Sequence, residues 1–101
     1  MDVSFVITAA LMTYDIKHKY CHAVGNVIAT QGQLRFSCQQ MRAYFVEKKI
    51  LKLKRIDAQK KVQMNYTTTK NYITITGPSA YFENKWVVFT DNPHVVITSN
   101  G

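Results

Sequence analysis

The sequence of 101 residues has no long run of hydrophobic side chains. Its apolar stretches are only a few residues long, whereas a membrane-spanning helix requires about 20. The first residues also lack the pattern of a signal peptide, because Asp2 stands where a signal would be basic and no long apolar stretch follows. The sequence alone therefore predicts either a cytosolic protein or one whose signal has been removed.

Motifs of known enzyme and metal sites are also missing. The sequence contains no glycine-rich phosphate loop and no GxSxG motif. Its acids are few. His18 and His22 are four residues apart but lie in a region of strand and turn signals, so they would not share a helix face for a metal, and His94 is isolated. We therefore expect no catalytic residues, no metal and no cofactor.

Cysteine is scarce. Cys21 and Cys38 form no CxxC motif and permit at most one disulfide. Free cysteines are commonly buried, so two separate buried thiols explain them as well as a disulfide does. A disulfide requires neighbouring strands with close Cα atoms, and the sequence does not decide between the two.

Positive charge is abundant, since Lys and Arg outnumber Asp and Glu by 13 to 6 and give a net charge of +7. This balance favours anionic partners such as nucleic acid, phospholipid head groups or phosphorylated glycolipid. The densest basic stretch supplies the candidate head-group residues Lys48, Lys49, Lys52, Lys54, Arg55, Lys60 and Lys61. Solvated strand faces that protect a sheet edge explain the same residues.

The hydrophobic pattern indicates strands along almost the whole chain. Residues 72–76, 86–90 and 95–98 are rich in β-branched and aromatic side chains, and residues 34–38 alternate between apolar and polar. Such alternation favours an antiparallel sheet over a parallel sheet buried on both faces. We predict a single all-β domain over residues 1–101, without long helices.

Turn signals separate these stretches at short intervals, which predicts strands of about five residues. The signals lie at residues 15–18, 25–26, 31–33, 47–49, 69–71, 77–78, 83–85 and 91–93. A weak internal repeat places a Gly, Asn or Pro kink between paired strands, where a strand can pass from one sheet to the next. Residues 39–49 also have the spacing of an amphipathic helix, although their surroundings favour a strand.

Alternation also predicts which side chains point inward. The inward set consists of Phe5, Ile7, Val27, Ala29, Leu34, Phe36, Ile56, Val62, Met64, Ile73, Ile75, Val95 and Ile97. Any β-sandwich would need such residues as its core. A thin all-β roll could equally use them to line an apolar groove.

Two stretches resemble the LptA/OstA-like lipopolysaccharide-transport family. The first runs from Ile7-Thr8-Ala9 through Met12 and Tyr14-Asp15 to Gly25-Asn26-Val27 and Gln31-Gly32, and the second runs from Ala80-Tyr81-Phe82 to Asn92-Pro93 and Val95. The order and spacing of these short motifs cover nearly the whole chain. In the middle of the chain, residues 58–62 read Ala-Gln-Lys-Lys-Val where the family pattern would have Gly-Asn-Val.

The resemblance implies a twisted, V-shaped antiparallel β-jellyroll that is open at both ends. It implies a periplasmic protein of cell-envelope and outer-membrane biogenesis, with lipopolysaccharide as its cargo. The inward set would shield the acyl chains of lipid A, and the basic set would attract the sugar-phosphate head. The terminal strands, at residues 3–9 and 95–99, would pair edge to edge with LptC, LptD or another copy. Whether the chain is LptA, LptC or part of LptD stays open.

Two other hypotheses fit the composition. A basic β-barrel that binds nucleic acid would use the aromatic residues and the net charge as a stacking platform. A purely structural β adaptor would use only its edges. Affinity for nucleic acid falls steeply with salt, whereas the burial of acyl chains hardly depends on it. The resemblance favours lipid over nucleic acid.

Overall fold

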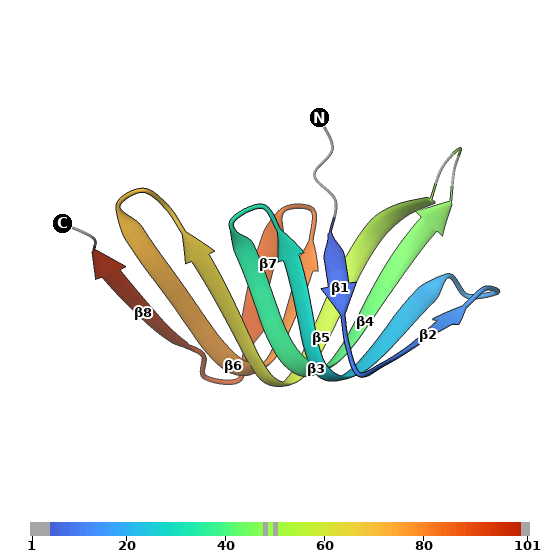
Figure 1. The fold of residues 1–101 in the computed structure, drawn as a ribbon, viewed down its shortest axis with the longest axis horizontal. Helices are drawn as coiled ribbons and strands as arrows, with labels where there is room; N and C mark the ends of the chain where they lie inside the picture. The colour runs from blue at the N-terminus through green and yellow to red at the C-terminus, as the bar shows by residue number, and fades with distance from the viewer. Residues whose placement is uncertain (1–4, 48, 50, 100–101) are drawn as a thin grey trace.

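The structure, a computed structural model, describes residues 5–47, 49 and 51–99. These residues form eight antiparallel strands (Figure 1). The strands are β1 (Val6–Thr8), β2 (Leu11–Asp15), β3 (Tyr20–Gln31), β4 (Leu34–Glu47), β5 (Leu51–Thr67), β6 (Asn71–Glu83), β7 (Trp86–Thr90) and β8 (His94–Ser99). The described residues contain no helix, as the alternating pattern predicts.

The strands form one open sheet. Its order is β1-β3-β4-β5-β6-β7, while β2 also pairs with β3 and β8 also pairs with β6. Within the described part of the chain, no pairing joins β1 or β2 to β7 or β8, so the sheet does not close into a barrel. The fold is the predicted open antiparallel roll rather than the closed barrel of the nucleic-acid hypothesis.

The central strands are much longer than the sequence predicts. β3, β4, β5 and β6 contain 12, 14, 17 and 13 residues, and each bends near its middle (Figure 1). The prediction of strands of about five residues was wrong, because the signals at residues 25–26 and 77–78 bend strands without ending them. Residues 39–47 belong to β4, so the helix alternative was also wrong.

The bends divide the sheet into two six-stranded arms that meet at an angle in Figure 1. The first, called the neutral arm for its composition, consists of β1, residues 27–31, 34–38, 62–67 and 71–77, and β8. The second, called the charged arm, consists of β2, residues 20–24, 40–47, 51–59 and 79–83, and β7.

Pairs of residues in the left-handed conformation mark the bends of β3 and β5 and the connection between β7 and β8. Gly25 and Asn26 have φ values of 84° and 48°, and Lys60 and Lys61 have φ values of 67° and 58°. Asp91 and Asn92 follow at 63° and 60°. In β3 and β5 these pairs coincide with breaks in the pairing register. Lys60 and Lys61 therefore adopt in β5 the left-handed backbone conformation that Gly25 and Asn26 adopt in β3. The middle of the sequence has no Gly-Asn pair, and the two lysines take its place.

Local chemistry explains two of the bends. At Gly25, a Cβ atom would lie 3.0 Å from the Cβ of Ala10, so a larger residue would be strained by both its φ and its neighbour. Pro78 lies opposite the bulge at Lys60 and Lys61, because the pairs on either side are Gln59 with Ser79 and Val62 with Gly77. A proline costs little there, since a bulge interrupts the ladder that would need its N–H.

The core lies between the inner faces of the two arms. The buried residues are Ala23, Val27, Ala29, Phe36, Cys38, Met41, Ala43, Ile56, Ala58, Val62, Met64 and Ala80. The ring of Phe82, from the charged arm, makes edge contacts with Phe5 and Phe36 of the neutral arm at centroid distances of 5.2 Å and 6.4 Å. These rings hold the arms together, because aromatic contacts add to the stabilisation from apolar burial.

Candidate functional site

The inner face of the neutral arm carries a continuous row of apolar side chains. Direct cross-strand partners form this row in the order Ile7, Ala29, Phe36, Met64, Ile75 and Val95. Partners on one face of a sheet lie close enough for their side chains to touch. The row spans the arm from one edge to the other with one residue from each strand.

The predicted inward residues fall mostly in this arm. Leu34, Ile73 and Ile97 form part of a parallel row nearer the tip, and Val27 and Val62 lie nearer the bend. Phe5 packs against the core from before β1. Ile56 is the exception, because it lies on the inner face of the charged arm and pairs with Ala43 and Phe82.

Of the residues on the inner face of the charged arm, the predicted inward set contains only Ile56. One row there contains Met12, Ala23, Met41, Ala58, Ala80 and Phe89, and the next contains Tyr14, Cys21, Ala43, Ile56, Phe82 and Val87. Met41, Ala43 and Phe45 alternate as a strand requires, and this signal could have revealed the row. The helical spacing of Met41 and Phe45 obscured it.

Burial differs between the strands of the shared inner face. Val27 and Ala29 on β3 are fully covered, whereas Val95 and Ile97 on β8 are 55% and 62% exposed. At the opposite edge, Met12 and Tyr14 on β2 are also exposed. The apolar face is therefore covered over its middle strands and exposed where β2 and β8 form its edges, whereas Ile7 on β1 and Phe89 on β7 pack against the core.

The outer face of the charged arm combines arginines, tyrosines and acids. Arg55 Nε donates to Asp57 Oδ1 at 2.6 Å, and its Nη1 lies 3.5 Å from Glu83 Oε1. The Arg55 guanidinium also lies 4.1 Å from the centre of the Tyr81 ring. The hydrogen bond to Asp57 raises the pKa of Arg55, so this side chain stays charged. Arg42 stacks similarly on Tyr20, at 5.2 Å.

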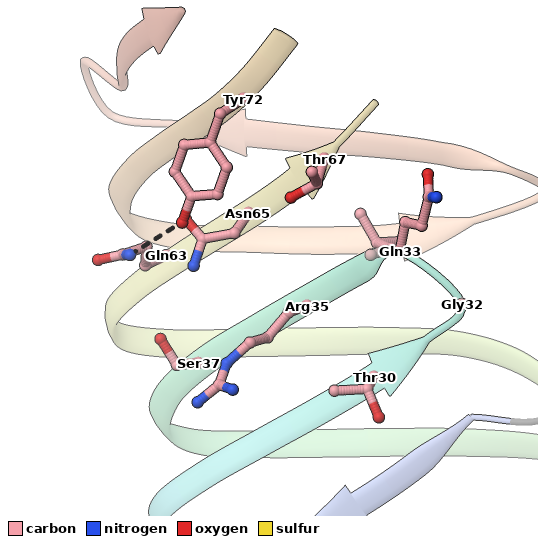
Figure 2. A pocket seen from close by; sticks show the side chains of 10 residues that line it. Thr30, Gly32, Gln33, Arg35, Ser37, Gln63, Asn65, Thr67 and Tyr72 are labelled. Atoms are coloured by element: carbon pink, nitrogen blue, oxygen red, sulfur yellow. Dashed lines mark hydrogen bonds between the residues drawn. The ribbon is translucent and has the colours of Figure 1, made fainter. Parts of the chain in front are cut away.

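The outer face of the neutral arm is hollowed and carries mostly uncharged polar groups. A concavity of about 510 Å³ is lined mainly by hydroxyl and amide side chains, together with Arg35 and Tyr72, and Leu34 contributes at its border (Figure 2). Gln63 donates to Asn65 at 3.2 Å, and Thr74 donates to the same Asn65 oxygen at 3.1 Å. This concavity lies on the opposite side of the sheet from the apolar rows.

The predicted basic residues do not form one patch. Lys49, Lys52 and Lys54 are exposed near the tip of the charged arm, and Arg55 lies on its outer face. Lys60 and Lys61 lie at the bend. Lys48 falls outside the described residues. We predicted one patch because these residues are close along the chain. Most of them lie on the long strand β5, however, which runs from the tip to the bend and beyond.

Both cysteines are free thiols, Cys38 buried and Cys21 half-buried. Burial raises the pKa of each. The backbone N–H of His18 donates to Asp15, and this bond lowers the pKa of that carboxyl. Among the described residues, no group of three or more His, Cys, Asp or Glu side chains is arranged to hold a metal ion.

Apolar strands form the edges of the sheet, and β2 and β8 are the more exposed of them. β1 (Val6–Thr8) and β2 form one edge, while β7 and β8 form the other. Val6 and Leu11 are exposed at the first edge, and all six residues of β8 are exposed at the second. The predicted terminal strands thus coincide with true edges where they are described. Separately, no helix in the described part of the chain is long and apolar enough to cross a membrane.

The sequence matches the model of a known protein family. The sequence model described as "LptA/(LptD N-terminal domain) LPS transport protein" matches residues 6–100. A search of curated proteins finds no match. The family match covers every described strand, including both edges and both inner faces.

Proposed function

The chain belongs to the family of LptA and LptD N-terminal-domain lipopolysaccharide transport proteins, and we propose that its inner face shields the acyl chains of lipid A in the periplasm. The observation that supports this proposal is the apolar face shared by the two arms, which is covered over its middle strands and exposed at β2 and at β8. If the inner face were only a closed core, we would expect Val95 and Met12 to be buried, but both are exposed.

The energetics favour acyl chains as the ligand. Each buried CH₂ group contributes about 0.8 kcal/mol, so several acyl chains supply enough driving force without specific polar recognition. The rings of Phe5 and Phe36 pack against Phe82 between the arms. Entry of acyl chains requires these rings to separate, and the acyl chains would then replace the apolar contacts that the rings lose.

Charged head groups would remain outside the apolar face. Among the predicted cations, Lys52 and Lys54 flank Leu53 on β5 near the tip of the charged arm, and Leu53 packs against the core. We expect these two lysines to attract the phosphates of lipid A. Replacing both with Gln should weaken lipopolysaccharide binding at low salt and matter less at high salt, because exposed charges are screened.

Photo-crosslinking at neighbouring positions of β6 tests the acyl-chain proposal. Ile75 lies on the inner face, whereas Thr74 lies on the outer face and donates to Asn65. With p-benzoylphenylalanine at each position in turn, lipopolysaccharide should crosslink at Ile75 and not at Thr74. Equal crosslinking at both positions, or crosslinking at Thr74 alone, would contradict the proposal.

The exposed edges support a second part of the proposal, a bridge between membranes. Unpaired N–H and C=O groups on an edge strand can template a strand of a partner. We propose that β8 and the β1–β2 edge pair with LptC, with LptD or with another copy. The order of the proteins along such a bridge would depend on which of the two edges each partner pairs with.

Crosslinking also tests the bridge. Val96 on β8 is directly opposite Thr74 on β6, and both lie on the outer face. Of these two strands, β8 is at an edge and β6 is not. With p-benzoylphenylalanine at each position in turn, Val96 should therefore give protein–protein adducts in cells and Thr74 should give none. If Val96 and Val6 both yield no adduct while Ile75 still captures lipopolysaccharide, the bridge fails and the acyl-chain proposal survives.

A further inference from the structure

Three hairpin turns form the tip of the charged arm. They join β2 to β3, β4 to β5, and β6 to β7, and the strands of these hairpins lie side by side in the order β2-β3-β4-β5-β6-β7 (Figure 1). We call five exposed residues in or directly beside these turns the basic rim: Ile16, Lys17, Lys49, Lys85 and Trp86.

The apolar members of the basic rim are far more exposed than such side chains usually are. Ile16 is 80% exposed and Trp86 is 72% exposed, in two different hairpins. Neither contributes to the core between the arms. A tryptophan beside lysines is characteristic of residues that sit at a membrane–water interface, where the ring meets the acyl boundary and the charge meets the phosphates.

The charge at this tip is also suited to an anionic surface. Lys17, Lys49 and Lys85 are exposed, one from each hairpin. Three carboxylates lie near these turns, of which Asp15 is bonded to His18 and Glu83 lies beside Arg55. The third, Glu47 at the end of β4, is exposed and offsets part of the positive charge. The lysines and the two engaged acids still leave a net positive charge at this tip.

The tip of the neutral arm provides the contrast. Its turns consist of Gln31-Gly32-Gln33 and of residues 68–70, with Lys70 as the cation. Neither turn contains an acid, a tryptophan or an exposed isoleucine. The two tips come from the same sheet, so the fold itself does not require apolar and basic residues in turns.

We propose that the basic rim docks the charged arm onto the surface of an anionic phospholipid bilayer. Ile16 and Trp86 enter the interface, and the three lysines contact lipid phosphates. This inference goes beyond the transport of lipopolysaccharide, and its residues are separate from those of the acyl-chain and edge-pairing proposals.

Trp86 supplies the test, because it is the one tryptophan of the chain. Its fluorescence should shift to the blue when the intact protein meets vesicles of phosphatidylcholine with phosphatidylglycerol, since the indole leaves water. Pure phosphatidylcholine vesicles should give a much smaller shift. Added salt should reverse the shift, because the attraction to the anionic surface is screened.

Variants assign the effect to the rim. Each lysine near an anionic surface contributes about fivefold to partitioning, so Lys17→Gln combined with Lys85→Gln should weaken vesicle binding about 25-fold. The matched control is Lys70→Gln in the neutral arm, which should change binding less than twofold, within the scatter expected for a residue away from the surface. Ile16→Ser should reduce both the affinity and the blue shift.

Three results would overturn the proposal. The first is no blue shift with anionic vesicles, and the second is an equal loss of binding in Lys70→Gln and in the double rim variant. The third is a blue shift that depends on protein concentration without vesicles, which would make the rim a contact between copies. Lipopolysaccharide crosslinking at Ile75 does not involve the rim, so its success or failure is a separate result.

Discussion

The two arms have alike inner faces and very different outer faces. Both contribute rows of apolar side chains to one shared interior. Outside, the described residues of the neutral arm include no Asp or Glu, and Arg35 and Lys70 are its only cations. The charged arm carries two stacked arginines, an ion-pair cluster around Arg55 and most of the described lysines.

This difference shows that the fold constrains the composition of the inner faces and leaves the composition of the outer faces free to vary. Both inner faces must be apolar, because the arms are stabilised by burying them against each other. An antiparallel sheet can expose its other face to water and places few demands on its composition. The outer faces and the tips are therefore where the two arms could acquire separate roles.

The largest effect is expected from comparing the centre of the inner face with its edge. Ile56 is 2% exposed, while Ile97, also predicted to point inward, lies on the exposed strand β8. Ile56→Ala should lower the free energy of unfolding by about 2–5 kcal/mol, and Ile97→Ala by less than about 0.5 kcal/mol. Urea denaturation of the two variants measures this difference, and equal losses would contradict the burial gradient.

The bends give the next largest effect. Lys60 and Lys61 hold a left-handed conformation that a side chain makes unfavourable by about 1 kcal/mol or more per residue, and Gly-Asn holds the same conformation in β3. Lys60→Gly with Lys61→Asn should therefore stabilise the protein by about 1–2 kcal/mol in thermal unfolding. The reverse change, Gly25→Lys, should destabilise it. A loss of stability in the first variant would show that the lysine side chains make contacts that matter more than their backbone strain.

A matched pair of arginines compares the outer faces. Arg55 contacts Asp57, Glu83 and Tyr81, whereas Arg35 lies exposed beside the concavity of the neutral arm. Because the Arg55 side chain is 36% exposed, solvent screening limits its contribution, and Arg55→Ala should cost about 1 kcal/mol at low salt. Arg35→Ala should cost less than about 0.5 kcal/mol. An Arg55 effect that does not shrink in high salt would point to lost packing rather than to lost charge.

The cysteines give the smallest effect. Both lie on the inner face, but Cys21 is half-buried next to the edge strand β2 and Cys38 is buried at the bend. Alkylation should modify Cys21 first. Burial raises the pKa of both thiols, so at neutral pH each is mostly protonated and its alkylation rate should keep rising as the pH passes the ordinary thiol value. Mass spectrometry of partly alkylated protein identifies the order, and faster reaction of Cys38 would contradict it.

The sequence predicted the fold class and most of the apolar row in the neutral arm. Alternation is reliable there, because the pairing of Leu34 to Ser37 and of Ile73 to Ile75 contains no register shift. It was less useful in the charged arm, where a register break between Tyr44 and Phe45 and the helical spacing of Met41 and Phe45 masked the pattern. Gly25-Asn26 was recognised as a kink, but Lys60-Lys61 was not, since lysine carries no local signal for that conformation.

The grouping of basic residues was harder to predict for a physical reason. Residues close in sequence are far apart on a long strand that rises about 3.3 Å per residue. Lys49 and Lys61 therefore lie at opposite ends of one arm, at its tip and at the bend. Conversely, the turns that form the basic rim are distant in sequence, and only the pairing of β2 through β7 brings them to one tip.

We propose that the inner faces of both arms serve as one binding surface for acyl chains. Isoleucine methyl groups report on it directly in NMR spectra. Ile7 and Ile75 lie inside the neutral arm, Ile56 lies inside the charged arm, and Ile28 lies on the outer face.

Titration with lipopolysaccharide should shift the methyl signals of Ile7, Ile56 and Ile75 and leave that of Ile28 unchanged. Deacylated lipopolysaccharide should shift none of them. Shifts confined to Ile28, or equal shifts with the deacylated molecule, would contradict the claim.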